Sequence, residues 1–311
     1  MNTIIPSPPQ ADLIRRTFNL KPTEPLPALT PIEGGMTNSS FRFRCRGEDC
    51  ILREPGEDTG LFVFRDQEAA SYRAISSLGI SDEVLALEPE TGRKISRFWD
   101  GARIADPRNS QDVRRCMAQL RHLHDCRIAV PHRYELGRLN RLFLDWMPPS
   151  SVHPGHRELQ QSCMDMEKIL RRYTAQHAVL CHCDPVAANF LFFPRDGREE
   201  LRLIDWEYSG MADPAVDLAM FANDAGYTPE ETDGLIRCYL GGEPAPDFTM
   251  RVYGYLAFTA DTLSNWEEYL RAQGIDSGDY GQRQFQTAVL YSRLFWELLP
   301  KVESEAGHGS D

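Results

Sequence analysis

Three oxygen-bearing side chains stand out because each follows a short apolar segment. Asp184 and Asn189 come after residues 178–181, and Asp205 comes directly after residues 201–204. Side chains at the ends of strands can converge on one cleft. Taken singly, Asp184 is explained as a turn cap before Pro185, Asn189 as a left-handed bend, and Asp205 as a cap of the following segment. The three together favour a functional site.

Phosphoryl transfer is the chemistry that this set of groups suits, because positioning and charge neutralisation supply most of its catalysis. A carboxylate at position 184 would orient a substrate hydroxyl and accept its proton. Five residues later, the Asn189 amide oxygen would coordinate Mg²⁺ without adding charge, and Asp205 would link the ion to the phosphates.

The segments that must position these groups begin with a β-rich region. Residues 41–45 alternate and residues 49–53 form a second short strand, so with turn residues 47–49 between them they predict a hairpin. A helix is expected over residues 66–78, ending at Gly79, and strands over residues 84–87 and 93–98. Before this region, residues 1–30 predict a lead-in helix near residues 11–18 followed by a linker.

After Gly101 the pattern becomes helical, with apolar faces over residues 113–123 and 159–173. A strand-rich island follows at 178–181, 190–193 and 201–204, with a hairpin loop at 194–198. Long helices are expected near residues 215–223, 229–240, 247–273 and 282–299. The polar tail after Lys301 is expected to fray.

Composition excludes several functional classes. With 34 basic and 46 acidic residues the net charge is −12, and no basic stripe suggests a nucleic-acid partner. The sequence shows no leader and no run of eighteen apolar residues, so we expect a cytoplasmic protein without membrane insertion. Eight dispersed cysteines indicate reduced thiols. The Cys181-His182-Cys183 cluster lacks a second ligand pair at zinc spacing, although a zinc hydrolase remains an alternative.

The pattern His182-x-Asp184-x4-Asn189, followed by Ile204-Asp205-Trp206-Glu207-Tyr208, resembles the choline/ethanolamine kinases, in particular bacterial choline kinases. These enzymes lie within the aminoglycoside phosphotransferase and protein-kinase-like superfamily. The resemblance extends over roughly residues 30–300 through these segments: residues 34–38, 51–53, Glu68, Asp213-Pro214-x-x-Asp217 and residues 278–283. It implies a two-lobed protein-kinase-like α+β fold. Residues 1–99 would form a small β-rich nucleotide-binding lobe, and 100–311 a larger, mainly helical catalytic and substrate-binding lobe.

The same resemblance implies ATP and Mg²⁺ as cofactors, Asp184 as the catalytic base, and Asn189 and Asp205 as Mg²⁺ ligands. Arg53 would take the place of the usual strand lysine, with Glu68 as its carboxylate partner. The alternative for Glu68 is a solvated charge on a helix face. The remaining nucleotide-binding candidates are Gly34, Gly35, Thr37 and Asn38 in a phosphate-covering turn, and Phe98 beside the adenine or as a packed hinge aromatic.

Choline or a related amino alcohol is the acceptor that the resemblance implies. A quaternary ammonium group donates no hydrogen bond, so aromatic faces and carboxylates must bind it. The candidates are Glu207, Tyr208, Trp266, Tyr269 and Tyr280. Trp266 and Tyr269, three residues apart on a helix, are equally explained as core residues. Ethanolamine, thiamine and aminoglycosides remain alternative acceptors, and a catalytically silent nucleotide-binding module is a further alternative. The oligomeric state is not readable from the sequence.

Overall fold

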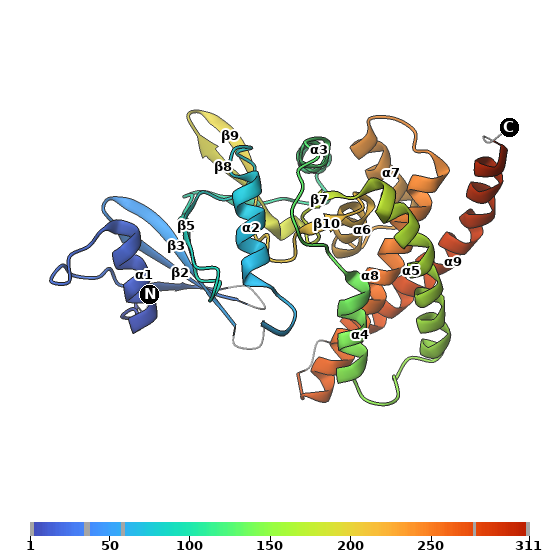
Figure 1. Ribbon diagram of the computed structural model, residues 1–311, viewed down its shortest axis with the longest axis horizontal. Coiled ribbons are helices and arrows are strands. Elements are labelled where there is room, and N and C mark those ends of the chain that lie inside the picture. The colour runs from blue at the N-terminus through green and yellow to red at the C-terminus, as the bar shows by residue number, and fades with distance from the viewer. Residues whose placement is uncertain (1–2, 34–37, 57–59, 276–277, 309–311) are drawn as a thin grey trace. The chain divides into compact units, whose positions relative to one another are not determined.

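The computed structural model describes residues 3–33, 38–56, 60–275 and 278–308. Its chain divides into two compact units. Unit 1 comprises Met1–Ile104 and Ala188–Tyr208, and unit 2 comprises Ala105–Ala187 and Ser209–Asp311. Figure 1 shows a sheet-rich first third of the chain and a helical remainder.

Unit 1 is built on an antiparallel five-stranded sheet in the order β1-β2-β3-β5-β4. Its strands are β1 (Thr30–Ile32), β2 (Asn38–Cys45), β3 (Glu48–Pro55), β4 (Val84–Leu87) and β5 (Lys94–Arg97). The predicted hairpin over residues 41–53 is confirmed as β2 and β3, which turn at Arg46 and Gly47, both with positive φ. Strand β1 lies where the sequence predicted a linker.

Helix α1 (Pro8–Phe18) packs its apolar face on this sheet. Leu13 and Ile14 enter a core with Phe43, Leu52 and Ile95. The lead-in segment is therefore part of the core of unit 1. Helix α2 (Arg65–Ile75) also faces the sheet, and the hydroxyl of its Tyr72 accepts a hydrogen bond from buried Lys94 on β5 at 2.5 Å.

A second, three-stranded sheet in unit 1 has the order β6-β8-β9. Its strands are β6 (Arg103–Ile104), β8 (Phe190–Arg195) and β9 (Arg198–Leu203). The predicted hairpin loop is confirmed, with Asp196 and Gly197 at positive φ. The sequence suggested two contiguous lobes that meet between residues 99 and 100. In the structure, unit 1 also includes residues 188–208, which come much later in the chain.

Unit 2 is mainly helical. Its helices are α3 (Ser110–Asp125), α4 (Leu136–Trp146), α5 (His156–His177), α6 (Ala215–Asp224), α7 (Pro229–Leu240), α8 (Pro246–Ala272) and α9 (Tyr280–His308). Strands β7 (Val179–Cys181) and β10 (Gly210–Ala212) form an antiparallel pair. A 3₁₀ turn, η2 (Ala187–Asn189), joins the two units along the chain.

Helix α8 is the central element of unit 2, since it contacts α4, α5, α6 and α9 and is buried over most of its circumference. The helices expected near residues 215–223, 229–240 and 247–273 are confirmed. The last helix was expected to end at residue 299 but continues through Pro300 to His308. A proline there removes one backbone hydrogen bond without ending the helix. No described helix is both long and apolar enough to cross a membrane.

We expect Ile14→Ala to lower the free energy of unfolding by about 2–5 kcal/mol, because Ile14 is fully buried between α1 and the sheet. Urea denaturation followed by circular dichroism measures the change. Asp12→Ala, at an exposed position of the same helix, should alter stability by less than about 0.5 kcal/mol. Equal stability of the two variants would show that α1 is not part of the core.

Candidate functional site

The guanidinium group of Arg53 is the centre of a buried charge network in unit 1. Its Nη2 atom donates to a Glu68 carboxylate oxygen on α2 at 2.7 Å and to the Gly92 carbonyl at 3.0 Å. Its Nη1 atom donates to Asp205 Oδ1 at 3.0 Å. Strand β3, helix α2 and the segment after β9 thus bring together three residues that the sequence analysis selected.

Arg65, in the first turn of α2, adds a second cation to this network. Its Nη1 atom lies 2.8 Å from Glu207 Oε2 and 3.5 Å from Glu68 Oε2. Asn38 on β2 also donates to Glu207 Oε2, at 3.1 Å. The Glu207 side chain is only 2% exposed, so its carboxylate is held inside the network rather than on an open surface.

The network contains two guanidinium groups and three carboxylates, so it carries one excess negative charge. Asp205, with a side chain 31% exposed, is the carboxylate most open to solvent. Burial and the charge of Asp205 raise the pKa of Glu207, while Arg53 and Arg65 oppose the shift. Burial alone would lower the pKa of Arg53, but Glu68 and Asp205 raise it, so Arg53 stays charged. Crowded carboxylates of this kind suit a divalent cation with hard oxygen ligands.

The backbone of Asn189 lies beside the segment that carries Asp205. Its backbone carbonyl accepts a hydrogen bond from Ile204 N at 2.9 Å, and Asp205 follows directly. The Asp205 backbone is left-handed, with φ of 65°. A non-glycine residue in this conformation is uncommon and is found where the surroundings hold it, often at functional sites. Asn189 and Asp205, both predicted metal ligands, are therefore neighbours in unit 1.

Asp184 belongs to a loop of unit 2 that follows strand β7. Asp217 on α6 holds this loop: its Oδ2 accepts from His182 N at 3.0 Å and its Oδ1 accepts from Cys183 N at 2.7 Å. The Cys183 backbone is also left-handed, with φ of 66°. His124 Nε2 contacts Asp217 Oδ2 at 3.0 Å, and His124 Nδ1 contacts the Tyr239 hydroxyl. The backbone before Asp184 is thus fixed by a fully buried carboxylate.

Two further groups of unit 2 accompany Asp184. Asp224 Oδ2 accepts from Ala187 N at 3.2 Å, within the segment between Asp184 and Asn189. Burial raises the pKa of Asp224. Burial first, and then the charges of Asp224 and Asp184, raise the pKa of Tyr280 to about 12, so its phenol stays neutral up to alkaline pH. Asp184, Asp224 and Tyr280 therefore share one electrostatic environment.

The other predicted aromatic residues have varied surroundings. In unit 1, Tyr208 stacks parallel to Phe62 at 6.5 Å between centroids, and the Arg42 guanidinium covers the Phe98 ring at 3.9 Å. In unit 2, Trp266 and Tyr269 lie three residues apart on α8, both half-buried, and Tyr269 contacts Trp146 at 5.3 Å. Gly34, Gly35 and Thr37 lie outside the described residues.

A cluster of metal-ligating residue types in unit 2 is explained by hydrogen bonding. His124, Cys181 and Asp217 offer atoms within 4.8 Å of one another. Both Asp217 oxygens already accept hydrogen bonds from the loop, and burial keeps the pKa of Cys181 well above its usual value. His124 is engaged as well, with Asp217 through Nε2 and with the Tyr239 hydroxyl through Nδ1. This arrangement gives no support to a zinc hydrolase.

Comparison with known proteins identifies the family. The phosphotransferase enzyme family model matches residues 28–250. The chain belongs to the phosphotransferase enzyme family. The family expected from the two motifs is confirmed, and so is the α+β protein-kinase-like fold.

Protein LicA of Haemophilus influenzae is 24% identical over 217 residues, which are 66% of this chain and 61% of LicA. A choline/ethanolamine kinase family protein from Mesorhizobium loti is 28% identical with a TM-score of 0.68, covering 91% of this chain and 94% of that one. Choline kinase LicA from Streptococcus pneumoniae is 23% identical with a TM-score of 0.70, covering 85% and 94%.

Three residues of these networks were not predicted from the sequence to have a role: Arg65, Asp217 and Asp224. Asp217 was visible as part of the Asp213-Pro214-x-x-Asp217 motif, but spacing could not show that it binds the backbone before Asp184. Arg65 lies three residues before Glu68 on one helix face, which is a detectable signal for a shared partner. Asp224 carries no sequence signal, because its partner is a backbone N–H.

We expect Glu68→Gln to destabilise the protein by about 3–5 kcal/mol, because it removes the charge that balances the buried Arg53. Chemical denaturation measures the loss. Glu54→Gln is the matched control, since the Glu54–Arg93 pair is about one fifth to one quarter exposed and should contribute less than about 1 kcal/mol. A Glu68→Gln variant as stable as Glu54→Gln would contradict a structural role for the Arg53 pair.

Proposed function

We propose that this phosphotransferase moves the γ-phosphoryl group of ATP to the hydroxyl of choline or a related amino alcohol, with Mg²⁺ as the metal ion. The observation that carries the proposal is the Arg53 guanidinium bonded to both Glu68 and Asp205 in unit 1. A metal-bound triphosphate requires a fixed cation for its phosphate oxygens and a carboxylate for its metal ion, and Arg53 and the partly exposed Asp205 offer these two groups side by side.

In unit 1, Asn189 and Asp205 would hold Mg²⁺, and the excess negative charge of the network supports this assignment. Glu68 and Gly92 fix the Arg53 fork, so its orientation is set before a phosphate arrives. Asn38 belongs to the proposed phosphate-covering segment, together with Gly34, Gly35 and Thr37. When bound, the ion would neutralise the phosphate oxygens during transfer.

In unit 2, Asp184 would orient the acceptor hydroxyl and take its proton as the phosphoryl group is transferred. Asp217 supports this role because it immobilises the backbone of His182 and Cys183 immediately before the base. A catalytic group held by a buried, rigid carboxylate loses little entropy when the substrate binds.

A cationic acceptor is supported by the environment of Asp184. Asp184 and Asp224 place negative charge beside the neutral phenol of Tyr280, and Trp266 and Tyr269 on α8 offer partly exposed rings. Cation–π contacts contribute about 0.5–2 kcal/mol each. The Mesorhizobium loti relative, named as a choline/ethanolamine kinase family protein, and the pneumococcal choline kinase support the same acceptor class. Glu207 and Tyr208, also predicted to bind substrate, are engaged with Arg65 and Phe62 in unit 1.

We expect Asp184→Asn to lower turnover by roughly 10²–10⁴ while ATP affinity stays within about threefold, because the amide cannot accept the proton. Steady-state kinetics with choline, ethanolamine, thiamine and kanamycin measures turnover, and calorimetric titration measures nucleotide affinity. Choline or ethanolamine should give the highest kcat/KM of the four.

Asp196→Asn is the matched control, since Asp196 lies in the β8–β9 turn with positive φ, a conformation that asparagine also tolerates. Its turnover should equal that of the unmodified protein. Unchanged turnover in Asp184→Asn would remove Asp184 from the mechanism. Nucleotide binding without transfer to any of the four acceptors would favour a silent nucleotide-binding module.

A further inference from the structure

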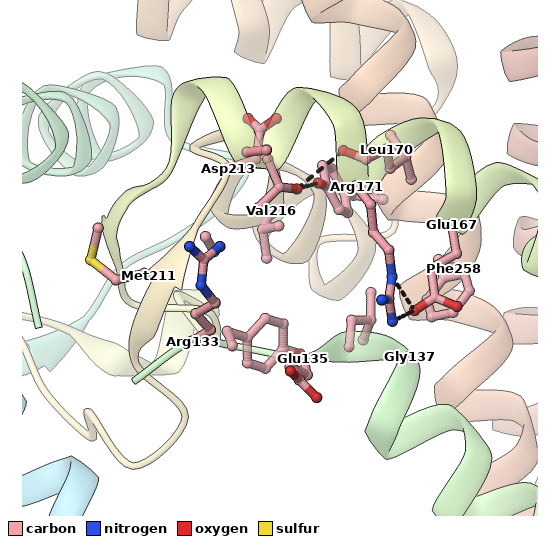
Figure 2. Close-up of a pocket in the computed structure, with 16 residues that line it drawn as sticks. Arg133, Glu135, Gly137, Glu167, Leu170, Arg171, Met211, Asp213, Val216 and Phe258 are labelled. Carbon is pink, nitrogen blue, oxygen red and sulfur yellow. Dashed lines mark hydrogen bonds and ion pairs between the residues drawn. The ribbon is translucent and has the colours of Figure 1, made fainter. Parts of the chain in front are cut away.

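Unit 2 contains a cavity of about 280 Å³ whose lining includes none of the residues proposed above for catalysis or substrate binding. It lies among the start of α4, the C-terminal half of α5, strand β10, the start of α6 and the middle of α8 (Figure 2). Much of its wall is apolar, formed by Leu136, Leu170, Ala175, Met211, Val216 and Phe258. Its volume is close to the lower end of small-molecule pockets, roughly 300 Å³.

Arg133 is an exposed residue that lines this cavity, and its backbone is firmly held. Met211 N donates to the His132 carbonyl at 3.0 Å, Tyr134 N donates to the Met211 carbonyl at 3.3 Å, and Arg133 pairs with Met211 as a parallel bridge. Gly210 permits this close approach, since a Cβ atom there would lie 2.8 Å from Tyr134 N. The backbone of Arg133 is therefore held against strand β10.

The guanidinium group of Arg133 has no hydrogen bond or ion pair to another residue in the part of the chain that the structure describes. Figure 2 shows it extending toward Val216, on the opposite side of the cavity from Arg171. Asp213, although it lines the cavity, accepts two hydrogen bonds from Arg251 at 2.6 and 2.7 Å. Its charge is therefore already compensated.

The second arginine that lines the cavity, Arg171, is paired with a carboxylate. Arg171 donates to Glu167 Oε1 at 2.8 Å, and its pKa is raised chiefly by this hydrogen bond and also by the charge of Glu135. Figure 2 shows the Glu135 carboxylate directed away from the centre of the cavity. Among the described residues, Arg133 is thus the arginine of the cavity lining whose side chain has no hydrogen-bonded or ion-paired partner.

We infer that this cavity binds a small organic anion whose charged end pairs with Arg133 and whose apolar body lies against Leu170, Val216 and Phe258. A carboxylate or phosphate group matches the two-donor fork of a guanidinium group. The apolar wall makes no hydrogen bonds, so the remainder of the ligand is aliphatic or a single ring. Strand β10 in the cavity wall pairs with β7, whose end leads to Asp184.

Calorimetric titration of the full chain with hexanoate, hexyl phosphate and hexanol tests the inference without any measurement of phosphoryl transfer. Its failure is therefore distinguishable from failure of the proposed function. We expect saturable binding of hexanoate, hexyl phosphate or both, and at least about tenfold weaker binding of hexanol, which lacks the charge. The anion that binds more tightly shows whether the charged end of the ligand is a carboxylate or a phosphate group.

Arg133→Gln should weaken anion binding at least about tenfold, since the charge-assisted hydrogen bonds are lost. Ala175→Phe, at an exposed position of α5 that lines the cavity, should abolish binding by filling the space. Arg172→Gln is the matched control, an exposed arginine of α5 outside the lining, and should bind as the unmodified protein does. The inference is overturned if neither anion binds, if hexanol binds equally well, or if Arg133→Gln and Arg172→Gln bind alike.

Discussion

A buried guanidinium group, that of Arg53, connects three segments of unit 1 that are far apart in the sequence. It bonds Glu68 on α2, the Gly92 carbonyl between β4 and β5, and Asp205 after β9. A buried charge is costly unless its partners are close and well oriented. The position of α2 against the sheet and the position of the segment after β9 therefore both depend on this one group.

A buried carboxylate plays the corresponding part in unit 2. Asp217 accepts hydrogen bonds from two successive backbone N–H groups and contacts His124, so the loop that carries Asp184 is held by side-chain chemistry rather than by regular secondary structure. Left-handed backbone at Cys183 and Asp205 marks the two places where the chain must depart from a strand to present a polar group. In unit 1 the buried Arg53 bonds the more exposed Asp205, and in unit 2 the buried Asp217 holds the backbone that precedes the more exposed Asp184.

Local patterns in the sequence were sufficient to predict the β2–β3 and β8–β9 hairpins and most helices, because alternation and helical periodicity report burial directly. Short elements such as β6 and β10 were missed, since two or three residues carry no detectable period. The pairing of Arg53 with Glu68 came only from family resemblance, because no spacing rule joins residues on a strand and a separate helix. Asp217 and Asp224 accept hydrogen bonds from backbone N–H groups that tertiary packing brings to them, and single-residue chemistry does not reveal these contacts.

The Mg²⁺ dependence of ATP binding tests most directly the claim that the Arg53 network prepares a metal–nucleotide site. Calorimetric titration of ATP with and without Mg²⁺ would compare the unmodified protein, Asp205→Asn and the control Asp66→Asn, an exposed residue of α2. We predict that Mg²⁺ strengthens ATP binding by roughly tenfold or more in the unmodified protein and in Asp66→Asn, and that Asp205→Asn loses most of this gain. Equal strengthening by Mg²⁺ in all three proteins would contradict the account.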